Sequence, residues 1–439
     1  MKTLKTAALL LLASMGLQAQ TDSTSVKKVP FEGMDLTWIN GQNRQSSSLL
    51  TLADKEGETI LTGVAYVDAY YNYSFHKPKD NTHTISSAIG RSNEFQINMA
   101  SIGIETNYKS IIGRLWLQYG QMGSIVQDAD GTIGHGRNTN INNLKYIREA
   151  AAGYHFDVAY GLNVEAGIFM SYIGLESYVL NENWSYQRSM PCDFTPFYFQ
   201  GARAQFFPTK NFKQELWLLN GWQTYNGWNQ GLGLGSSSYY RPTENLQLVA
   251  NFYLNGQDTR NNKDVRRFHH DHSVVARYFK DKESKGISQA AFSINNHYGF
   301  QSGGGLKVSD NFMAGTSIAN RIWFNKNKLG LTLRGDYVTN PGAYLAFSPS
   351  SVADNDFNDA LAQGKDLKMF QGTATFDIMP NDYMTFRLEY AYRSSNIPYF
   401  AGPGGTTSPD GWADTPTDGW RPDLRKSENR VTVAVNFRL

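Results

Sequence analysis

From residue 61 onward, apolar and polar side chains alternate along the chain with a period of two. In the first such stretch Val67 and Tyr71 fall on one face, whereas Asp68 and Tyr70 fall on the other. Successive side chains of a β-strand point to opposite sides, so one face can contact lipid while the other contacts water. The same division recurs at residues 111–119, 162–169, 246–254, 329–337, 384–393 and 431–439. The pattern predicts an all-β protein whose amphipathic strands span a membrane.

The connections between these stretches alternate between short and long. The short ones fall at residues 107–110, 157–160, 208–211, 241–244, 281–284, 325–328 and 380–382. The long ones fall near 76–92, 121–143, 176–196, 222–230, 255–265, 298–309, 340–366 and 395–427. Short periplasmic turns and long extracellular loops are the rule for outer-membrane barrels. We therefore expect a transmembrane antiparallel β-barrel of about 16 strands with both ends of the barrel domain, residues 61–439, in the periplasm.

One predicted strand, residues 93–108, changes register along its length. Its apolar positions shift from Phe95, Ile97 and Met99 to Ile102 and Ile104. One inserted residue is the simplest cause of such a shift, so we expect a β-bulge around residues 100–101.

The first 60 residues differ from the rest. A basic start and a short apolar run lead to a small residue at position 19, which predicts a secretory signal peptide over residues 1–19. The apolar run is too short for a membrane helix. Residues 20–60 are polar and show no alternation, so we expect an irregular segment that lies in the periplasm or is tucked into the lumen. The final strand, with Phe437 and Leu439 on its apolar face, resembles the signal that barrel-assembly machinery binds.

Composition narrows the class further. The chain has 41 Lys and Arg against 39 Asp and Glu, and the signal peptide removes Lys2 and Lys5, so the charges balance. That balance argues against a nucleic-acid partner. A mean hydropathy of −0.46 excludes a bundle of membrane helices, while 13% aromatic residues suit a barrel with a wet interior and aromatic girdles. The single cysteine, Cys192, excludes an internal disulfide.

Charged residues recur in the middle of strands on the polar face, where lipid would not tolerate them. They are either the lining of an aqueous channel, whose mixed signs would make it weakly selective, or pairs that fill the interior across strands. The candidate lining residues are Asp68, Arg114, Glu165, Arg203, Arg277, Arg321, Arg334, Asp336, Asp377, Arg387, Glu389 and Arg393.

The loop at residues 176–196 is a candidate constriction. A long loop of a barrel either folds inward and narrows the lumen or stays outside. The polar and aromatic candidates on it are Asn181, Asn183, Trp184, Tyr186, Gln187 and Arg188.

The cluster at residues 268–272 contains three histidines and an aspartate. Zinc needs ligands that converge, but on a strand only His270 with His272, or His269 with Asp271, share a face. We favour a polar rim over a metal site and expect no metal or cofactor.

No Gly-x-Ser-x-Gly element is present, and Ser273 is only a sequence neighbour of His272, so we expect no enzymatic activity.

Several segments resemble the OmpL-like β-barrel porin-2 family of Gram-negative outer membranes. They are 35–41 (DLTWING), 166–169 (AGIF), 172–176 (YIGLE), 196–203 (PFYFQGAR), 219–222 (LNGW), 240–242 (YRP) and 386–390 (FRLEY), together with Ser185, Ser189, Arg393 and Ser394. The resemblance implies an outer-membrane pore and brings no catalytic residues.

These observations together predict a channel in the cell outer membrane for passive diffusion of small hydrophilic solutes. The alternative is a plugged receptor or adhesin-type barrel whose long loops bind a ligand. The expected partners are outer-membrane lipid and lipopolysaccharide, the solutes, and the assembly machinery during insertion. The sequence does not determine the oligomeric state, for which a homotrimer is one alternative.

Overall fold

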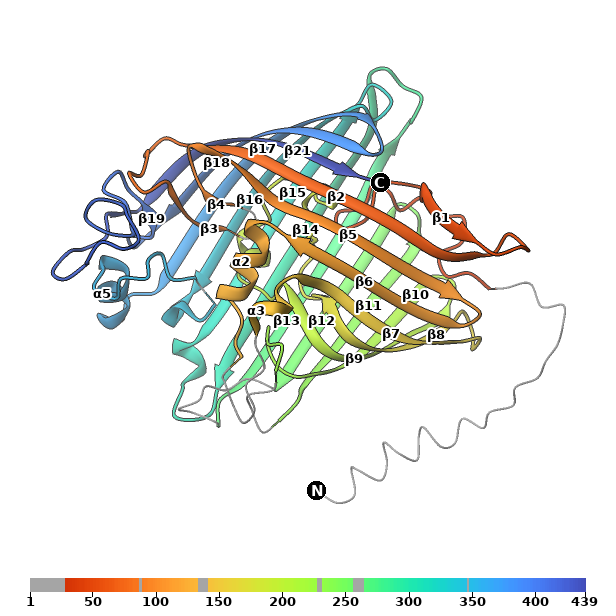
Figure 1. Ribbon diagram of the computed structural model, residues 1–439, viewed down its shortest axis with the longest axis horizontal. Helices are drawn as coiled ribbons and strands as arrows, with labels where there is room; N and C mark the ends of the chain where they lie inside the picture. Colours follow the sequence, from red (N-terminus) through yellow and green to blue (C-terminus); the bar gives the residue numbers. More distant parts are fainter. Residues whose placement is uncertain (1–27, 87–88, 133–140, 227–230, 256–263, 346) are drawn as a thin grey trace.

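Sixteen strands form a closed antiparallel barrel (Figure 1). The computed structural model describes residues 28–86, 89–132, 141–226, 231–255, 264–345 and 347–439, so the predicted signal peptide lies outside the described residues. The last strand pairs with the first, with Tyr66 opposite Arg438 and Ser74 opposite Arg430, and this pairing closes the sheet. The predicted fold class is confirmed.

The barrel strands follow one another around the wall in chain order, each antiparallel to its neighbours. They are β2(Thr59–Ser74), β5(Glu94–Tyr108), β6(Ile111–Tyr119), β7(Ile147–Phe156), β8(Leu162–Met170), β9(Tyr198–Thr209), β10(Phe212–Leu219), β11(Gly233–Thr243), β12(Leu246–Asn255), β13(Arg266–Lys280), β14(Ile287–Ser302), β15(Phe312–Phe324), β16(Leu329–Asn340), β17(Leu367–Asn381), β18(Met384–Ser395) and β21(Ser427–Arg438). All seven short connections fall where the sequence predicts them, at the end where the C-terminus lies. That end is the periplasmic one by the rule for such barrels.

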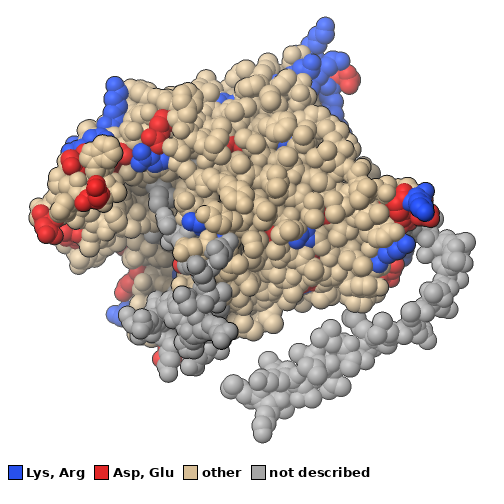
Figure 2. Space-filling model, in the orientation of Figure 1, with Lys and Arg blue, Asp and Glu red and all other residues tan. Residues whose placement is uncertain are grey.

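The wall has an apolar outside and a polar inside, as the alternation predicts. On β2 and β5, Asp68 and Asn98 are fully buried, whereas Val67 and Ile102 are 40% and 61% exposed on the outer surface. Figure 2 shows the charged side chains of one face gathered at the two ends of the barrel, with a band nearly free of charge between them. That band has the character of a lipid-facing surface.

The bulge lies two residues before its predicted place. Asp68 pairs with Met99, and the next residue of β2, Ala69, pairs with Ile97, so Asn98 is the extra residue. Asn98 and Met99 both point inward, and the Asn98 amide donates a hydrogen bond to Asp68 at 2.8 Å. The prediction at residues 100–101 was wrong because it placed Met99 on the outer face.

Short elements occupy the loops and the N-terminal region. The strands are β1(Leu50–Ala53), β3(Thr82–Ser86), β4(Ile89–Arg91), β19(Phe400–Ala401) and β20(Leu424–Arg425); the helices are α2(Gln121–Asp128), α3(Ile141–Leu144), α4(Met190–Asp193) and α5(Asp356–Ala362), with 3-10 turns η1(Leu180–Glu182), η2(Val308–Asp310) and η3(Pro341–Ala343). β1 pairs with the start of β2, which corrects the expectation that residues 20–60 are irregular throughout. Within the described ranges, no helix is long and apolar enough to cross a membrane.

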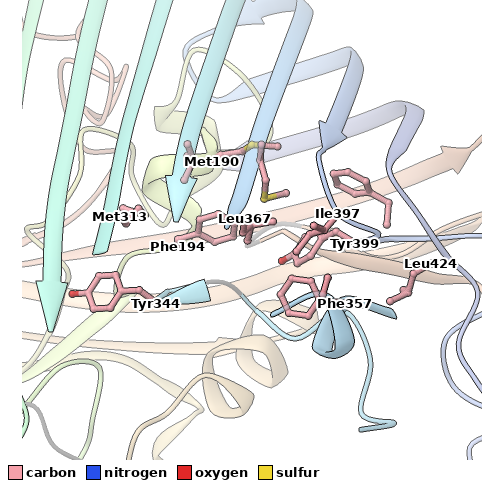
Figure 3. Close-up of a cluster of buried hydrophobic side chains, with 13 residues drawn as sticks. Met190, Phe194, Met313, Tyr344, Phe357, Leu367, Ile397, Tyr399 and Leu424 are labelled. Atoms are coloured by element: carbon pink, nitrogen blue, oxygen red, sulfur yellow. The ribbon is translucent and has the colours of Figure 1, made fainter. Parts of the chain in front are cut away.

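An apolar cluster covers part of the extracellular end (Figure 3). It joins Met190 and Phe194 of the connection between β8 and β9 to Tyr344 and Phe357 of the connection between β16 and β17. The last extracellular connection adds Ile397, Tyr399 and Leu424. Loops that are far apart in sequence therefore form one packed cap over this end of the barrel.

Candidate functional site

The connection between β8 and β9, residues 171–197 and hereafter the inner loop, folds into the barrel. Among the candidates on it, Asn183, Trp184, Tyr186, Gln187 and Arg188 are at most 4% exposed. Asn181 is partly buried beside them. Backbone N–H and C=O groups inside a barrel need partners, and charged side chains of the wall supply them.

Arg387 of β18 holds the backbone of the inner loop most extensively. Its guanidinium donates to the carbonyl of Leu180 at 2.9 Å and to that of Ser185 at 3.2 Å, and it also donates to the carbonyl of Asn183. On the wall side its Nε donates to Asp377 at 3.0 Å. The planar fork of an arginine suits this multiple contact.

Two further arginines act in the same way. Arg334 of β16 donates to the carbonyls of Gln187 at 2.6 Å and Arg188 at 3.1 Å. Arg321 of β15 donates to the carbonyl of Trp184 at 2.8 Å and pairs with Asp377 at 2.6 Å. Arginines from three strands therefore fix the backbone of the inner loop against one side of the wall.

Carboxylates of the wall accept hydrogen bonds from the inner loop. Glu389 accepts from the N–H of Tyr186 at 2.7 Å, and Asp68 accepts from the hydroxyl of Tyr186 at 3.0 Å. Asp336 accepts from the N–H of Met190 at 3.4 Å and pairs with Arg334 at 3.2 Å. The structure thus brings Asp68, Asp336 and Glu389 together with the candidate loop.

The other candidates lie elsewhere inside the barrel. Arg393 contacts the first extracellular connection, with Nη2 3.0 Å from Nε2 of His83, and pairs with Glu428. Arg114 and Arg203 both pair with Glu165, on the wall formed by β6 to β9. The side chain of Arg114 is 25% exposed and that of Arg203 is 11% exposed, whereas that of Arg387 is 2% exposed. Arg114 and Arg203 are therefore less buried than the arginines that hold the inner loop.

Residues 29–46, hereafter the N-terminal arm, cross the periplasmic mouth. At one side the N–H of Phe31 donates to the carbonyl of Lys210 at 2.9 Å. At the other side Arg44 donates to the carbonyl of Asn381 at 2.8 Å and Gln45 to that of Arg438 at 2.9 Å. The arm therefore spans from the β9–β10 turn to the C-terminal strand.

The middle of the arm reaches the inner loop. The indole of Trp184 donates to the carbonyl of Trp38 at 2.9 Å, and the N–H of Gly41 donates to the carbonyl of Glu182 at 3.0 Å. Trp38 and Ile39 are 3% and 2% exposed. The arm and the inner loop are thus in direct contact inside the barrel.

Asp35 anchors the arm to the wall. It lies 3.0 Å from Arg277 and 2.6 Å from Lys282. Burial acts to raise the pKa of Asp35, but hydrogen bonds from Lys282, Thr37 and Arg277 outweigh it and hold the pKa well below its ordinary value. A lowered carboxyl pKa stabilises the contact above the ordinary Asp pKa of about 4, so the anchor is lost only in stronger acid.

Several side chains of this region did not appear among the sequence candidates. Glu176 pairs with Arg334 at 3.0 Å and accepts from the N–H of Ser189, and Glu215 lies 2.9 Å from Lys213 and 3.8 Å from Arg203. Glu215 could have been found from the sequence, because it is a charged residue in the middle of a predicted strand. Glu176 lies in the 172–176 segment that carries the family resemblance, but a charge on a loop does not reveal which residues it contacts.

Many polar atoms between the inner loop and the wall have no protein partner. Among the described residues these include both amide atoms of Gln187, both of Asn340, Oε1 of Gln371, Oδ1 of Asp336 and two nitrogens of Arg188. Buried polar groups are almost always satisfied, and ordered water does so where protein does not. Protein groups alone therefore leave these buried polar atoms unsatisfied, and ordered water is the usual partner at such positions.

The histidine cluster divides as the strand geometry requires. His269 and Asp271 point inward and are fully buried, whereas His270 and His272 point outward. Nε2 of His269 lies 3.1 Å from Nδ1 of His297. Within the described part of the chain, no three His, Cys, Asp or Glu side chains are grouped as metal ligands.

A closed barrel of 16 strands, with a loop folded inside it and an apolar outer band, is the architecture of a porin-type channel of the outer membrane. The chain belongs to the family described as "Putative beta-barrel porin-2, OmpL-like", whose model matches residues 61–439. A search of curated proteins found no match.

Solved structures share the architecture at low sequence identity. The outer membrane channel DcaP of Acinetobacter baumannii is 11% identical with a TM-score of 0.51, over 89% of this chain and 100% of that one. OmpT, an outer membrane protein of Vibrio cholerae, is 10% identical with a TM-score of 0.49, over 87% and 97%. An anion-selective porin from Comamonas acidovorans is 10% identical with a TM-score of 0.49, over 86% and 99%. The likeness to DcaP supports the fold.

Proposed function

We propose that the barrel lets small hydrophilic solutes diffuse passively through a polar lumen of mixed charge, which the inner loop narrows. The observation that carries the proposal is the polar interior of the barrel, where buried polar atoms of the inner loop and wall lack protein partners. A barrel evolved only as a rigid scaffold would pair such groups, because each unpaired buried group costs about 1–3 kcal/mol. Water at these positions keeps the interior polar enough for hydrated solutes.

The proposed route follows the wall of β6 to β10. Here Arg114 lies 3.4 Å from Glu149, Arg203 lies 3.8 Å from Glu215, and Lys213 lies 2.9 Å from Glu215. Charges of both signs therefore occur along this wall. Such a lining favours polar solutes through local fields without strong preference for cations or anions.

The remaining candidates act indirectly in this proposal. Arg321, Arg334, Asp336, Asp377, Arg387 and Glu389 are each at most 5% exposed, and so is Asp68. They position the inner loop and so set the width of the route. Arg277 positions the N-terminal arm in the same way.

Planar-bilayer recording of the purified full-length protein tests the proposal. We expect discrete ohmic steps whose reversal potential in a salt gradient stays close to zero, because the lining charges balance. Arg114→Glu should move the reversal potential toward cation selectivity, since it changes the charge of a partly exposed lining residue by two. A barrel that inserts and gives no steps would contradict the channel.

A second candidate function is a plugged receptor or adhesin-type barrel. Two observations favour it: the N-terminal arm crosses the periplasmic mouth, and the apolar cluster covers part of the extracellular end. Such a barrel would give no steps in the same recordings, yet it would be heat-modifiable and correctly folded. The bilayer experiment therefore separates the two functions directly.

We also propose that copies of the chain associate in the membrane as a homo-oligomer, with a homotrimer as the candidate assembly. The outer surface of β13 to β15 carries a hydrogen-bonded polar row. Nδ1 of His272 lies 3.1 Å from Nε2 of His270, Asn296 lies 3.1 Å from His272, and Thr316 donates to Asn296 at 2.8 Å. Polar groups on a lipid-facing wall are costly, whereas a second copy with the same donors and acceptors would bind them.

Replacing this row by apolar side chains should dissociate the assembly. We expect the double variant His272→Leu, Asn296→Leu to run as a monomer in size-exclusion chromatography with light scattering, while the wild type runs as an oligomer. Leu333→Ala, on the outer surface of β16 and 56% exposed, is the matched control and should leave the mass unchanged. Equal masses for wild type and double variant would contradict this interface.

A further inference from the structure

A cavity of about 260 Å³ opens among the extracellular loops. Four connections contribute to it: Gly131 comes from the second, Pro196 from the inner loop, Trp222 from the fourth and Phe347 from the seventh. Arg267, the second residue of β13, completes the lining. Most of the wall is therefore apolar or aromatic, with one cation on it.

Arg267 is 6% exposed and lacks the partners that a buried arginine needs. Its Nε and Nη1 have no hydrogen-bond partner, and none of the described carboxylates forms an ion pair with it. Other buried arginines in this barrel have a polar partner: Arg387 pairs with Asp377, and Arg188, which has no ion pair with a described carboxylate, donates to the carbonyl of Cys192 at 2.6 Å. A desolvated cation without an anion is costly, so the site as built favours an anionic ligand.

Two rings hold the guanidinium in place. Its carbon lies 4.6 Å from the centre of the Trp222 ring and 4.8 Å from that of Tyr344. The amide and hydroxyl side chains among the described residues of the wall are already occupied: Gln223 donates to the carbonyl of Ala129 at 2.8 Å, and Thr195 donates to that of Cys192 at 2.7 Å. Arg267 is therefore the polar group of this wall that is free to bind a ligand.

Aromatic side chains continue from the cavity toward the charged wall. Trp222 lies 4.9 Å from Tyr253, which lies 6.0 Å from Phe199, and Tyr172 lies 5.2 Å from Phe199 and 4.9 Å from Trp217. Trp217 in turn lies 5.0 Å from the guanidinium of Arg203. A continuous series of contacting aromatic rings therefore extends from Arg267 at the mouth to Arg203 on the wall.

We propose that the cavity at Arg267 binds an organic anion, a carboxylate carried on a flat apolar or aromatic body. The guanidinium pairs with the carboxylate, and Trp222 and Phe347, which line the cavity, contact the body. A cavity of about 150 Å³ already holds benzene in another protein, so a single ring with a carboxylate fits here. The role of this site as the place where a transported solute first binds rests on the proposed channel function. The binding of the anion itself does not depend on that function.

Saturation-transfer NMR on the full-length protein in detergent tests the site, with sodium benzoate as the probe. We expect saturable binding of benzoate, weaker binding of acetate, which lacks the ring, and no competition by benzylammonium, which reverses the charge. Arg267→Met should weaken benzoate binding about 10- to 100-fold, the usual value of a hydrogen bond to a charged group. Arg266→Met, one residue away on the outer surface of the same strand, is the matched control.

Benzylammonium that binds as well as benzoate would overturn the proposal on the wild-type protein alone, even if Arg267→Met failed to fold. Arg267→Met that folds, as judged by heat modifiability, and binds benzoate like the wild type would overturn it too. Because this experiment measures binding in detergent, its result does not depend on conduction. A barrel that binds benzoate but gives no steps in bilayers would contradict only the channel.

Discussion

Arg387→Met is expected to release the inner loop from the wall and to raise the single-channel conductance. The guanidinium donates to three backbone carbonyls of that loop, and methionine can replace none of these bonds. Among the described residues, Asp377 would then keep a single arginine partner, Arg321. Removing one member of a buried ionic network costs about 3–5 kcal/mol, enough to change the fraction of undocked loop by about two to four orders of magnitude.

Two measurements check this expectation. Bilayer recordings should show larger and noisier steps than the wild type, and limited proteolysis should cut within residues 180–189, which are protected in the folded barrel. Arg425→Met is the control, because Arg425 is half exposed on the last extracellular loop and pairs only with Asp423 among the described carboxylates. Unchanged conductance together with unchanged protection of the inner loop would contradict the positioning role of Arg387.

The wall of the barrel could be predicted from the sequence because its strands and turns are determined by residues that are close together in the chain. An amphipathic strand must alternate, and a turn must be short at one end of the barrel, so a period of two and the spacing of turns suffice. The bulge at Asn98 was placed two residues late, since a polar side chain among Phe95, Ile97 and Met99 gave no sign that it was the inserted residue. Errors of this kind shift a register without changing the fold.

The interior could not be predicted to the same depth because its contacts join residues far apart in the chain. Arg114 and Arg387 occupy the same kind of mid-strand position, but only the path of the inner loop leaves one partly exposed and buries the other. Nothing in the sequence marked Arg267 as a binding residue, since it lies at a strand end beside a second arginine. Its importance arises from Trp222 and Tyr344, which come from two other loops.

The arm and the inner loop stabilise each other, so the width of the lumen depends on both. Trp184 of the inner loop donates to the backbone of Trp38, and its N–H donates to Asn40 at 3.2 Å. Trp184 also packs against Trp323 of the wall, with ring centres 5.8 Å apart. Undocking of the arm therefore removes contacts that hold the inner loop on its periplasmic side.

Trp38→Ala is expected to undock the arm. The indole donates to the carbonyls of Asp35 at 3.0 Å and Glu244 at 3.1 Å, and the guanidinium of Arg277 lies 4.9 Å from the ring. Truncation of a buried tryptophan costs about 3–5 kcal/mol, and the arm is too short to replace that loss with other contacts. The conductance should rise, because the periplasmic mouth would no longer be crossed by the arm.

Thiol labelling gives a readout of the arm that does not depend on conduction. Ile39→Cys places a reporter at a position that is 2% exposed; it should be protected from maleimide in the parent and labelled once Trp38→Ala is added. Cys192 contributes little background, because burial raises the pKa of its thiol to about 12 and keeps it protonated. Val29→Ala, at a position 43% exposed, should leave the reporter protected. If the reporter stayed protected beside Trp38→Ala while the conductance rose, the inner loop, and not the arm, would limit the passage.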